Sequence, residues 1–451
     1  MHASVHLRMN LQQRDKAVIW HPFTPLKSSP VPIPIVKGAG ALLTDESGND
    51  YIDAISSWWV TIHGHAHPYI AEKLYRQALT LEQVIFAGFT HYPAVELAER
   101  LLPHLPGPFS KIFYSDNGST ATEVALKMAL QYWWNQQGAT SYKPQATSGD
   151  NLQLVANSLQ PRTKLLAFNN SYHGDTFGSM SVSDRSVFTK AFHDLLFEVV
   201  FIDTPTAGNL SHTKDIIAQH AAQCAAFIYE PLVQGAGGMK MYDAELMDEL
   251  LSFVKSHRIL CIADEVMTGF YRTGKLFASA YMQQKPDIIC LSKGLTGGTM
   301  ALGVTAVTAP VIEAFTSDDN LKTFFHGHSF TANPLACTAA LASLDLLEKP
   351  ECAQQVADIV AQNSAFAQKL QSLSSSLPVK NIRRLGTIVA FEIAQGKDEY
   401  LNNIAVSVTR RALEAGVYLR PLGNTVYIMP PYCIETGQLQ KVYDTIEKIL
   451  T

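Results

Sequence analysis

The sequence has no Cys-x-x-Cys pair, no long apolar run and no large excess of either charge. Its six cysteines are scattered and indicate neither a zinc ribbon nor a disulfide framework, so we expect reduced thiols and a cytoplasmic protein. No apolar run approaches about 18 residues, and the N-terminal region lacks the apolar core of a signal peptide; we expect neither a membrane span nor a secretion signal. With a net charge of −5, we expect no nucleic-acid partner and no attraction to an anionic membrane.

The chain carries the apolar pattern of an α/β enzyme. Hydrophobic residues make up 47% of it and charged residues 17%, a composition that supports a large packed core. Continuous apolarity, in contrast to alternation, is typical of strands buried on both faces, so we expect a mainly parallel sheet between helices. Runs of this kind occur with helical or loop segments between most of them: KLLAFNN, FEVVFID, AAFIYEP, ILCIADEV and DIICLSKG.

We expect three divisions of the chain. Residues 1–60 form an N-terminal segment that packs with the small domain, and residues 61–332 form the large domain. Residues 333–451 form a smaller α/β domain with long helices, a strand near GTIVAFEIA and strands near VYLRP and TVYIMPP. The polar stretch Ala139–Thr163 is expected to be a surface insertion.

Polar residues follow the apolar runs at the points where the strands should end. Ligands of open α/β sheets bind beyond the carboxyl ends of the strands. The residues at these ends are Asn117-Gly118-Ser119, Tyr172-His173-Gly174, Glu230 with Gln234, Asp264-Glu265, and Lys293. A helix that begins at Gly118-Ser119 could hold a phosphate. Tyr172 suits a flat ring, Asp264 a protonated ring nitrogen, and Lys293 a Schiff base, a set that predicts pyridoxal 5′-phosphate (PLP).

Each of these features has an ordinary structural explanation when taken alone. An isolated Lys-Gly pair is usually part of a surface turn, and Asn-Gly-Ser before a helix is more often only a cap. His63-Gly-His-Ala-His67, with Asp264-Glu265 as further ligands, also suggests a metal-dependent hydrolase. Gly64 and Pro68 favour a loop over the strand that this alternative needs. We prefer the PLP interpretation because its parts follow one another at successive strand ends.

Two consecutive stretches resemble a known family. LCIADEVMTGFYRTGKLFA followed by DIICLSKGLTGG is similar to the signature of the class III (ω-type) PLP-dependent aminotransferases, with Asp264 and Lys293 separated by 293 − 264 = 29 positions. Further stretches resemble the branch of that family that converts 8-amino-7-oxononanoate to 7,8-diaminononanoate in biotin biosynthesis. They are HPFTPL, DAISSWWVTIHGHAHP, SDNGSTATEVALKMALQYW, YHGDTFGSMSVSD, EPLVQGAGGMKMY, FFHGHSFTANPLAC and LRPLGNTVYIMPPY, and the resemblance runs from about Trp20 to the C-terminus.

The resemblance implies PLP fold type I and a homodimer with its active sites at the subunit interface. It implies catalytic roles for Lys293, the Schiff-base lysine, for Asp264, which pairs with the ring nitrogen, and for Tyr172, which packs on the ring. The expected cofactor-binding residues are Gly118, Ser119, Tyr172, Glu230, Gln234, Asp264 and Lys293, with His328 and Ser329 reaching the phosphate from the partner subunit. The expected substrate-binding residues are Phe23, Trp58, Trp59, Tyr172, Asp175, Gly327 and Arg420, the last for a substrate carboxylate. No metal is expected.

The sequence departs from the family pattern at two positions. Phe23 stands where a tyrosine is usual, and His328 stands where a proline is frequent, next to Ser329 in place of threonine. Both changes lie where the amino donor should bind. The usual donor is S-adenosylmethionine, but a branch that uses lysine exists, and both donors remain open. Another ω-aminotransferase, acting on ω-amino acids or diamines, is the alternative function.

Overall fold

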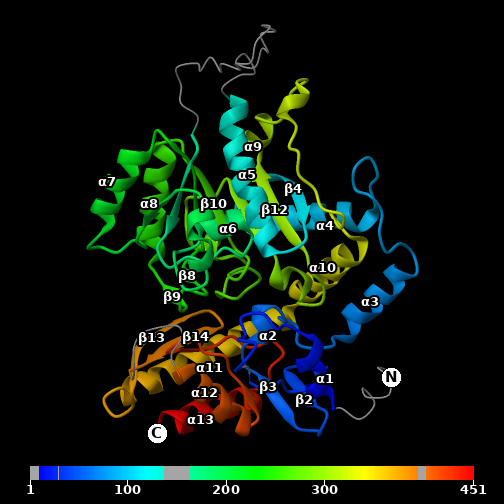
Figure 1. Cartoon of the computed structure of the whole chain (residues 1–451), viewed down its shortest axis with the longest axis vertical. Coiled ribbons are helices and arrows are strands. Elements are labelled where there is room, and N and C mark those ends of the chain that lie inside the picture. Colours follow the sequence, from blue (N-terminus) through cyan, green and yellow to red (C-terminus); the bar gives the residue numbers. More distant parts are fainter. Residues whose placement is uncertain (1–9, 29, 137–161, 395–402) are drawn as a thin grey trace.

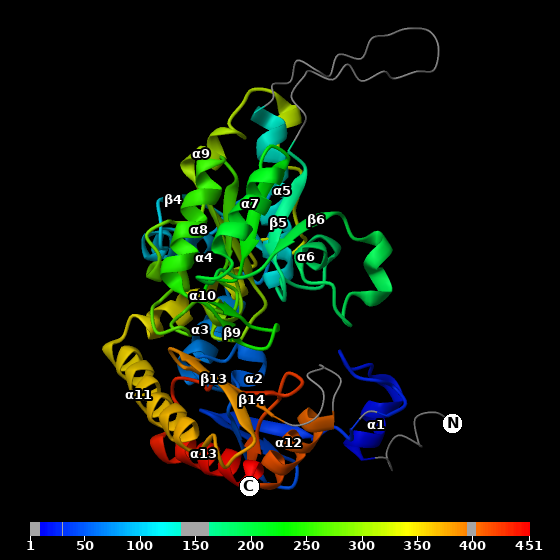
Figure 2. The same cartoon turned by 90° about the vertical axis from the view of Figure 1, so that its left-hand side faces the viewer.

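The computed structural model describes residues 10–28, 30–136, 162–394 and 403–451. Figure 1 shows a large sheet with its helices in one half of the molecule and two smaller sheets in the other half. The first and last described helices, α1 (Leu11–Val18) and α13 (Thr436–Leu450), both lie in the second half, as the turned view in Figure 2 also shows. None of the helices in these ranges combines the length and the apolarity that crossing a bilayer requires.

The large sheet has seven strands in the order β4-β12-β11-β10-β7-β5-β6. Six of them run in one direction, and only β12 is antiparallel to its neighbours β11 and β4. The strands are β4 (Phe109–Ser115), β5 (Lys164–Phe168), β6 (Val199–Ile202), β7 (Cys224–Tyr229), β10 (Leu260–Asp264), β11 (Ile288–Leu291) and β12 (Gly303–Thr308). The prediction of a mainly parallel sheet is confirmed.

Both faces of this sheet are covered, which explains the continuous apolar runs. Along β7, Phe227 and Tyr229 belong to the apolar cluster on one face, and Ala226 and Ile228 belong to the cluster on the other. Helix α5 packs on the second face. The helices of this half are α3 (Pro68–Ala78), α4 (Tyr92–Leu101), α5 (Gly118–Gln136), α6 (Phe177–Val182), α7 (Leu210–His220), α8 (Ala244–Ser256), α9 (Ala309–Glu313) and α10 (Pro334–Leu347), with the hairpin strands β8 (Val233–Gln234) and β9 (Lys240–Met241).

The smaller sheets join the two ends of the chain. One has the order β1-β2-β3-β15 and the other β13-β14-β16, so strand β3 near the N-terminus pairs with strand β15 near the C-terminus. Their elements are β1 (Ile35–Ala39), β2 (Leu42–Asp45), β3 (Asp50–Asp53), α2 (Ser56–Trp59), α11 (Pro350–Leu373), β13 (Val379–Leu385), β14 (Ile388–Ile393), α12 (Asn403–Glu414), β15 (Val417–Tyr418) and β16 (Thr425–Ile428). The domain boundaries at 60/61 and 332/333 stay a prediction.

Every apolar run that predicted a strand forms one. The runs VYLRP and TVYIMPP become β15 and β16, which belong to different sheets. Sequence reasoning did not identify β12, the strand that follows Lys293 and runs antiparallel to both of its neighbours in the large sheet. The expected insertion Ala139–Thr163 lies almost wholly outside the described residues.

Candidate active site

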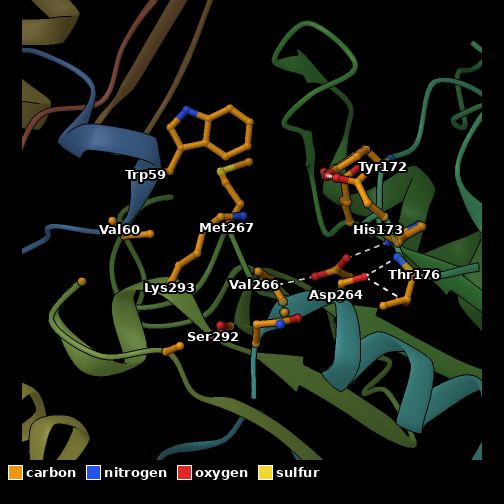
Figure 3. Close-up of a pocket in the computed structure, with 18 of the residues that line it drawn as sticks. Trp59, Val60, Tyr172, His173, Thr176, Asp264, Val266, Met267, Ser292 and Lys293 are labelled. Atoms are coloured by element: carbon orange, nitrogen blue, oxygen red, sulfur yellow. Dashed lines mark hydrogen bonds and ion pairs between the residues drawn. The ribbon is translucent and has the colours of Figure 1, made fainter. Parts of the chain in front are cut away.

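A cavity of about 690 Å³ opens at the carboxyl ends of β4, β5, β7, β10 and β11 (Figure 3). Trp59 lies on one side of it, Tyr172 and His173 on the other, and Lys293 rises between them. Its lining includes the predicted site residues Trp59, Gly118, Ser119, Tyr172, Asp175, Glu230, Asp264 and Lys293. The structure therefore brings together, from distant parts of the chain, eight of the residues singled out in the sequence.

Lys293 is held at a turn of constrained backbone between β11 and the short 3₁₀ helix that it begins. Its φ of 49° lies in the left-handed region, which is uncommon for a residue with a side chain, and the preceding Ser292 anchors the turn by donating to the Leu302 carbonyl at 2.7 Å. The Lys293 Nζ lies 5.0 Å from the ring centroid of Trp59. Burial lowers the pKa of Lys293, although the carboxylates of Asp264 and Glu230 oppose that shift. A larger share of the amine is therefore neutral, the form that can attack or accept a proton.

Asp264 ends β10 and forms a buried pair with His173. Its Oδ2 lies 2.7 Å from His173 Nδ1, and its Oδ1 accepts the Val266 N–H at 3.0 Å. A carboxylate can only accept, so His173 carries its proton on Nδ1 and donates it to Asp264. This arrangement fixes the carboxylate within the cavity.

The neighbouring Glu265 points away from the cavity and has a structural role. Its carboxylate accepts the Ala278 N–H at 3.0 Å, the Ser279 N–H at 2.6 Å and the Thr268 hydroxyl at 2.6 Å. The side chain is fully buried, and its hydrogen bonds tie the end of β10 to residues 278–279. The Asp264-Glu265 pair is thus divided between one residue in the cavity and one in the core.

The N-terminus of α5 supplies free N–H groups at the cavity. The first N–H groups of a helix have no acceptor within the helix. Asn117 satisfies two of them, since its side chain accepts from Thr120 and its carbonyl accepts from Ala121. The N–H groups of Gly118 and Ser119, which both line the cavity, remain for a ligand and suit an anion.

Gly174 lies against this helix N-terminus, and replacing it with alanine is expected to weaken cofactor binding. Its φ of 127° is unfavourable for other residues, and an added Cβ would lie 2.2 Å from the hydroxyl oxygen of Ser119. Ser119 must then move away from the phosphate position. We expect Gly174→Ala to weaken PLP affinity at least about tenfold, or about 1.4 kcal/mol, in an absorbance titration.

Gly88→Ala is the matched control for that variant. Gly88 also has a positive φ, of 97°, but an added Cβ there meets nothing within 4 Å in the part of the chain that the structure describes. This control imposes a similar backbone strain without the collision. Equal PLP affinity in the wild type and in Gly174→Ala would show that Gly174 is not needed to shape the phosphate site.

Tyr172 is held at the cavity wall from both ends. Its hydroxyl donates to Asp175 at 3.0 Å, and its backbone N–H donates to Glu230 at 3.1 Å. Glu230 also accepts the Gly235 N–H at 2.8 Å. Burial, reinforced by Asp175, raises the pKa of Tyr172 well above its ordinary value, so the hydroxyl stays protonated. Asp175 is exposed and available to a substrate, while Glu230 is buried behind the tyrosine.

Glu230 should make the stability of the protein pH-dependent. Burial is the main cause that raises its pKa to about 7; His173 opposes this shift and Asp264 reinforces it. An acid whose folded-state pKa exceeds its unfolded value binds a proton on folding, so its contribution is complete below pH 4.5 and is lost as the pH rises through about 7. Relative to Glu230→Gln, the wild type without cofactor should lose up to about 3 kcal/mol of unfolding free energy across this range.

Denaturant unfolding at a series of pH values measures this difference. The amide has a constant cost of its own, because it offers one acceptor to two N–H groups. The slope of the difference against pH is therefore the diagnostic quantity. Parallel stability curves for the two proteins would contradict a raised pKa for Glu230.

Phe23, Trp58 and Arg420 form a separate aromatic and cationic cluster beside the main cavity. The Phe23 and Trp58 rings are 5.6 Å apart and edge to face, and the Arg420 guanidinium lies 4.4 Å from the Trp58 ring centroid. Arg420 faces a smaller cavity of about 330 Å³ that is lined by residues of the N-terminal segment. These three residues do not line the cavity of Lys293, but Trp58 is adjacent to Trp59, which does.

Trp59 is fixed in the core by residues that sequence reasoning did not identify. Its indole N–H donates to the Tyr427 hydroxyl at 2.9 Å, and its carbonyl accepts from Arg272 at 3.4 Å. Arg272 is almost fully buried and also donates to the Pro430 carbonyl at 2.8 Å. His173, the partner of Asp264, was likewise not assigned a role. The spacing of these residues in the sequence does not predict their contacts, because the residues meet only in the folded chain.

Other predicted residues lie outside the cavity. Gln234 is buried and donates to the Asn169 carbonyl at 2.7 Å, so its predicted cofactor contact stays a prediction. Gly327, His328 and Ser329 lie on a partly exposed loop close to Asp116, and their predicted role in a partner subunit also stays a prediction.

The histidines of the metal alternative have separate partners. His63 is buried beside the Ser343 hydroxyl at 3.0 Å, and His65 lies 2.9 Å from Asp53. Burial lowers the pKa of His63 to about 3, so it stays neutral. In the described ranges, no group of three or more His, Cys, Asp or Glu side chains is placed to hold a metal ion.

The residues around the cavity fit a phosphate-bearing aromatic aldehyde. The Lys293 amine suits the aldehyde, Asp264 a protonated ring nitrogen, and the N-terminus of α5 the phosphate. The His173 Nε2 is buried without a hydrogen-bond partner in the described chain, as expected at a site shaped for a further polar group. An added Cβ at Gly118 would lie 2.6 Å from Val266, so this helix start cannot carry a side chain.

Comparisons with known proteins agree with this geometry. A family model described as "Aminotransferase class-III" matches residues 23–450. A Synechococcus elongatus protein named adenosylmethionine-8-amino-7-oxononanoate aminotransferase is 44% identical over 444 residues, which cover 96% of this chain and 98% of the relative. A solved structure of that name from Methanocaldococcus jannaschii is 32% identical, with a TM-score of 0.86 over 97% of this chain and 98% of the other. An amine transaminase from an uncultivated Pseudomonas species, in its PLP-bound form, is 28% identical, with a TM-score of 0.84 over 96% and 98%.

Proposed function

Because the chain belongs to the class III aminotransferase family, we propose that it is the PLP-dependent enzyme of biotin biosynthesis that converts 8-amino-7-oxononanoate to 7,8-diaminononanoate. The observation that carries the chemistry is the meeting of Lys293 and Asp264 in one cavity at adjoining strand ends. The observation that carries the substrate is 44% identity, over nearly the full length of both chains, to a relative named for this reaction. The fold is that of the PLP-dependent transferases of fold type I.

The proposal assigns each part of the cofactor to residues on the cavity wall. Lys293 holds the aldehyde, and Asp264 holds the proton on the ring nitrogen. The N–H groups of Gly118 and Ser119 bind the phosphate, and Tyr172 packs against the ring. When bound, PLP supplies an electron sink for the charge that forms when a proton leaves the carbon next to the amine.

The chain supplies the proton transfers and the fixed charges. Because burial lowers the pKa of Lys293, its Nζ can take the proton from the carbon next to the amine and return it at another position. His173 donates to Asp264 and holds its carboxylate in place, and a carboxylate at this position would favour a protonated ring nitrogen. The Trp59 ring lies 5.0 Å from the Lys293 Nζ and the lysine is only partly exposed, which limits the access of water.

Arg420 suits the carboxylate of the oxononanoate. A guanidinium binds a carboxylate through two parallel hydrogen bonds, and the contact with the Trp58 ring restrains the guanidinium of Arg420. Phe23 packs edge to face on Trp58 and presents a ring without a hydroxyl. The acceptor would thus lie along an apolar wall with its charged end at Arg420. Trp58, Asp175 and Gly327 complete the proposed substrate site.

S-adenosylmethionine is the proposed amino donor, because the relative is named for it. The missing hydroxyl at Phe23 is the observation that favours lysine as an alternative donor for the same reaction. An aminotransferase that uses ω-amino acids or diamines is the alternative function. Arg420 favours the first proposal over a diamine substrate, which has no carboxylate. It suits an ω-amino acid equally well, so against that alternative the first proposal rests on the 44% identity to the relative named for this reaction.

Product formation with matched donors tests this proposal. The purified protein is supplied with PLP and 8-amino-7-oxononanoate and with S-adenosylmethionine, lysine or a diamine, and the product is measured by mass spectrometry. We expect 7,8-diaminononanoate with S-adenosylmethionine. Product with lysine alone would replace the donor and keep the reaction. Turnover of diamines with other keto acids, but none with 8-amino-7-oxononanoate, would overturn the assignment.

We further propose a homodimer in which the loop Gly327–Ser329 reaches the phosphate site of the partner subunit. Gly327 is exposed, and an added Cβ there meets no atom of the described residues within 4 Å. Gly327→Leu should therefore fold normally but obstruct the partner's site, lowering PLP occupancy by at least about tenfold.

Mixed dimers give the control for that prediction. One chain carries Gly327→Leu and the other Lys293→Ala, so that one of the two sites combines an intact lysine with an intact loop. Recovery of activity in the mixture supports a loop that acts between subunits. Full PLP occupancy in the Gly327→Leu homodimer would exclude the loop from the site.

We also propose that the enzyme works in the cytoplasm. All six cysteines are free thiols, and five of them are buried. This is the cysteine chemistry of a reducing compartment.

A further inference from the structure

A chain of four polar side chains connects α5 to the loop that contains Gly327. Lys127 Nζ lies 2.9 Å from His326 Nδ1, and His326 Nε2 lies 3.0 Å from His328 Nε2. His328 Nδ1 then lies 3.3 Å from Asp116 Oδ2. Asp116 directly precedes Asn117-Gly118-Ser119, the turn at which α5 begins. The chain therefore runs from the surface of α5 through two imidazole rings to the edge of the phosphate site of its own subunit.

Within this series of four side chains, each hydrogen bond can have only one donor and one acceptor. An ammonium group only donates and a carboxylate only accepts, so His326 accepts at Nδ1 and carries its proton on Nε2. His328 then accepts at Nε2 and carries its proton on Nδ1, facing Asp116. Burial, together with Lys127 and His328, lowers the pKa of His326, while Glu123 opposes the shift, so this ring stays neutral at pH 7. Both nitrogens of both rings are engaged within one subunit.

The same rings are fixed to the framework by packing and by a short turn. The Phe324 ring stacks on His326 with 5.7 Å between centroids, and Lys127 lies 5.8 Å from the Phe324 ring. The His328 N–H donates to the Thr331 hydroxyl at 2.9 Å, and the Thr331 N–H donates back to the His328 carbonyl at 3.1 Å. Between the two anchored histidines, Gly327 is exposed, and so is the adjoining Ser329.

We propose that the Lys127–His326–His328–Asp116 chain positions this loop, and that His328 is a positioning residue that braces Ser329 and the Gly327 backbone for the partner's phosphate. This inference rests on the proposed dimer and changes the role expected for His328. A histidine that donates to a phosphate needs a free N–H group, and here the hydrogen bonds place the His328 proton on Nδ1, 3.3 Å from Asp116 Oδ2. The phosphate contact therefore falls to Ser329 and to the loop backbone.

Substitutions that interrupt the hydrogen-bonded series of side chains, at positions that do not contact the phosphate, test the inference. His326→Ala removes the middle of the chain, and Lys127→Met removes its exposed end, which is remote from any phosphate contact. Lys111→Met is the matched control, an exposed lysine on β4 that is not part of the chain. For each protein we measure PLP affinity, kcat at saturating PLP, and hydrogen exchange of the amides of residues 324–331 without cofactor.

We expect His326→Ala to weaken PLP affinity about tenfold and to speed amide exchange in the loop, with kcat at saturating PLP within about twofold of the wild type. Lys127→Met should have a smaller effect of the same kind, and the double variant should be no weaker than His326→Ala, because both changes break one chain. Lys111→Met should behave as the wild type.

Unchanged affinity and exchange in His326→Ala would overturn the inference, as would additive effects of the two substitutions. Lys127 is exposed, so its variant is expected to fold even if His326→Ala does not. If the wild type itself bound no PLP, the proposed function would fail. The exchange measurement on the cofactor-free protein would still decide whether the chain braces the loop.

Discussion

Replacing Lys293 with alanine is expected to lower turnover by on the order of 10⁴-fold or more, with little change in folding. The lysine is the amine in the cavity that meets the requirements for both covalent attachment and proton transfer, and burial lowers its pKa toward the range where it works as a base. Its loss removes both functions together. Steady-state kinetics with saturating PLP and 8-amino-7-oxononanoate measure the effect.

Lys285→Ala is the matched control for Lys293→Ala. Burial also lowers the pKa of Lys285, but its ammonium donates to the carbonyls of Ser279 and Met282, outside the cavity. This variant should lose some stability and retain the turnover of the folded protein. Comparable turnover in Lys293→Ala and the wild type would refute the assignment of the active site.

Asp264→Asn is expected to lower kcat by about 10²- to 10³-fold, because it removes a fixed charge and keeps the shape of the side chain. The amide can still accept from the Val266 N–H, and it also leaves His173 without its charged partner. A ring nitrogen that is no longer held in its protonated form is a poorer electron sink. The expected signature is a fall in kcat that added PLP does not restore.

Glu265→Gln distinguishes this catalytic effect from a structural one. Glu265 is the next residue and is also buried. Its carboxylate accepts hydrogen bonds from Thr268, Ala278 and Ser279. Its substitution should cost about 1–3 kcal/mol of stability, since one N–H group loses its acceptor, while kcat per folded molecule stays near that of the wild type. If the two variants lost activity equally, the charge of Asp264 would have no special role.

The large sheet could be predicted because strands that are buried on both faces consist almost entirely of apolar residues. In β7, β10 and β11 every residue is buried, and each reads as an uninterrupted apolar run. The polar residue that follows each run then marks a strand end, and the ends of parallel strands converge on one edge. The sequence alone therefore predicts that Lys293 and Asp264 lie in one site, as the structure shows.

The contacts that tune the site could not be predicted in the same way. His173 and Asp264 are 91 positions apart, and Trp59 and Tyr427 are 368 positions apart. Such pairs depend on how the loops after each strand fold over the sheet edge, which local periodicity does not encode. The position of β15 beside β3 has the same origin, since pairing between the two ends of the chain leaves no pattern in either segment.

The substitution of His328 illustrates a third case. In the sequence, the histidine stands where the family frequently has a proline. In the structure both of its ring nitrogens have partners within the subunit, His326 and Asp116. The side chain that seemed suited to bind a phosphate is therefore better explained as a support for the residues beside it.

The most direct test is the visible absorption spectrum of the PLP-saturated protein during sequential additions. We expect a band that depends on Lys293, disappears when S-adenosylmethionine is added, and returns when 8-amino-7-oxononanoate follows. Loss of the band with lysine alone would change the donor and leave the site and the acceptor in place. A protein that shows no Lys293-dependent band after PLP is supplied, or whose band does not return with 8-amino-7-oxononanoate after any donor, would contradict the central claim.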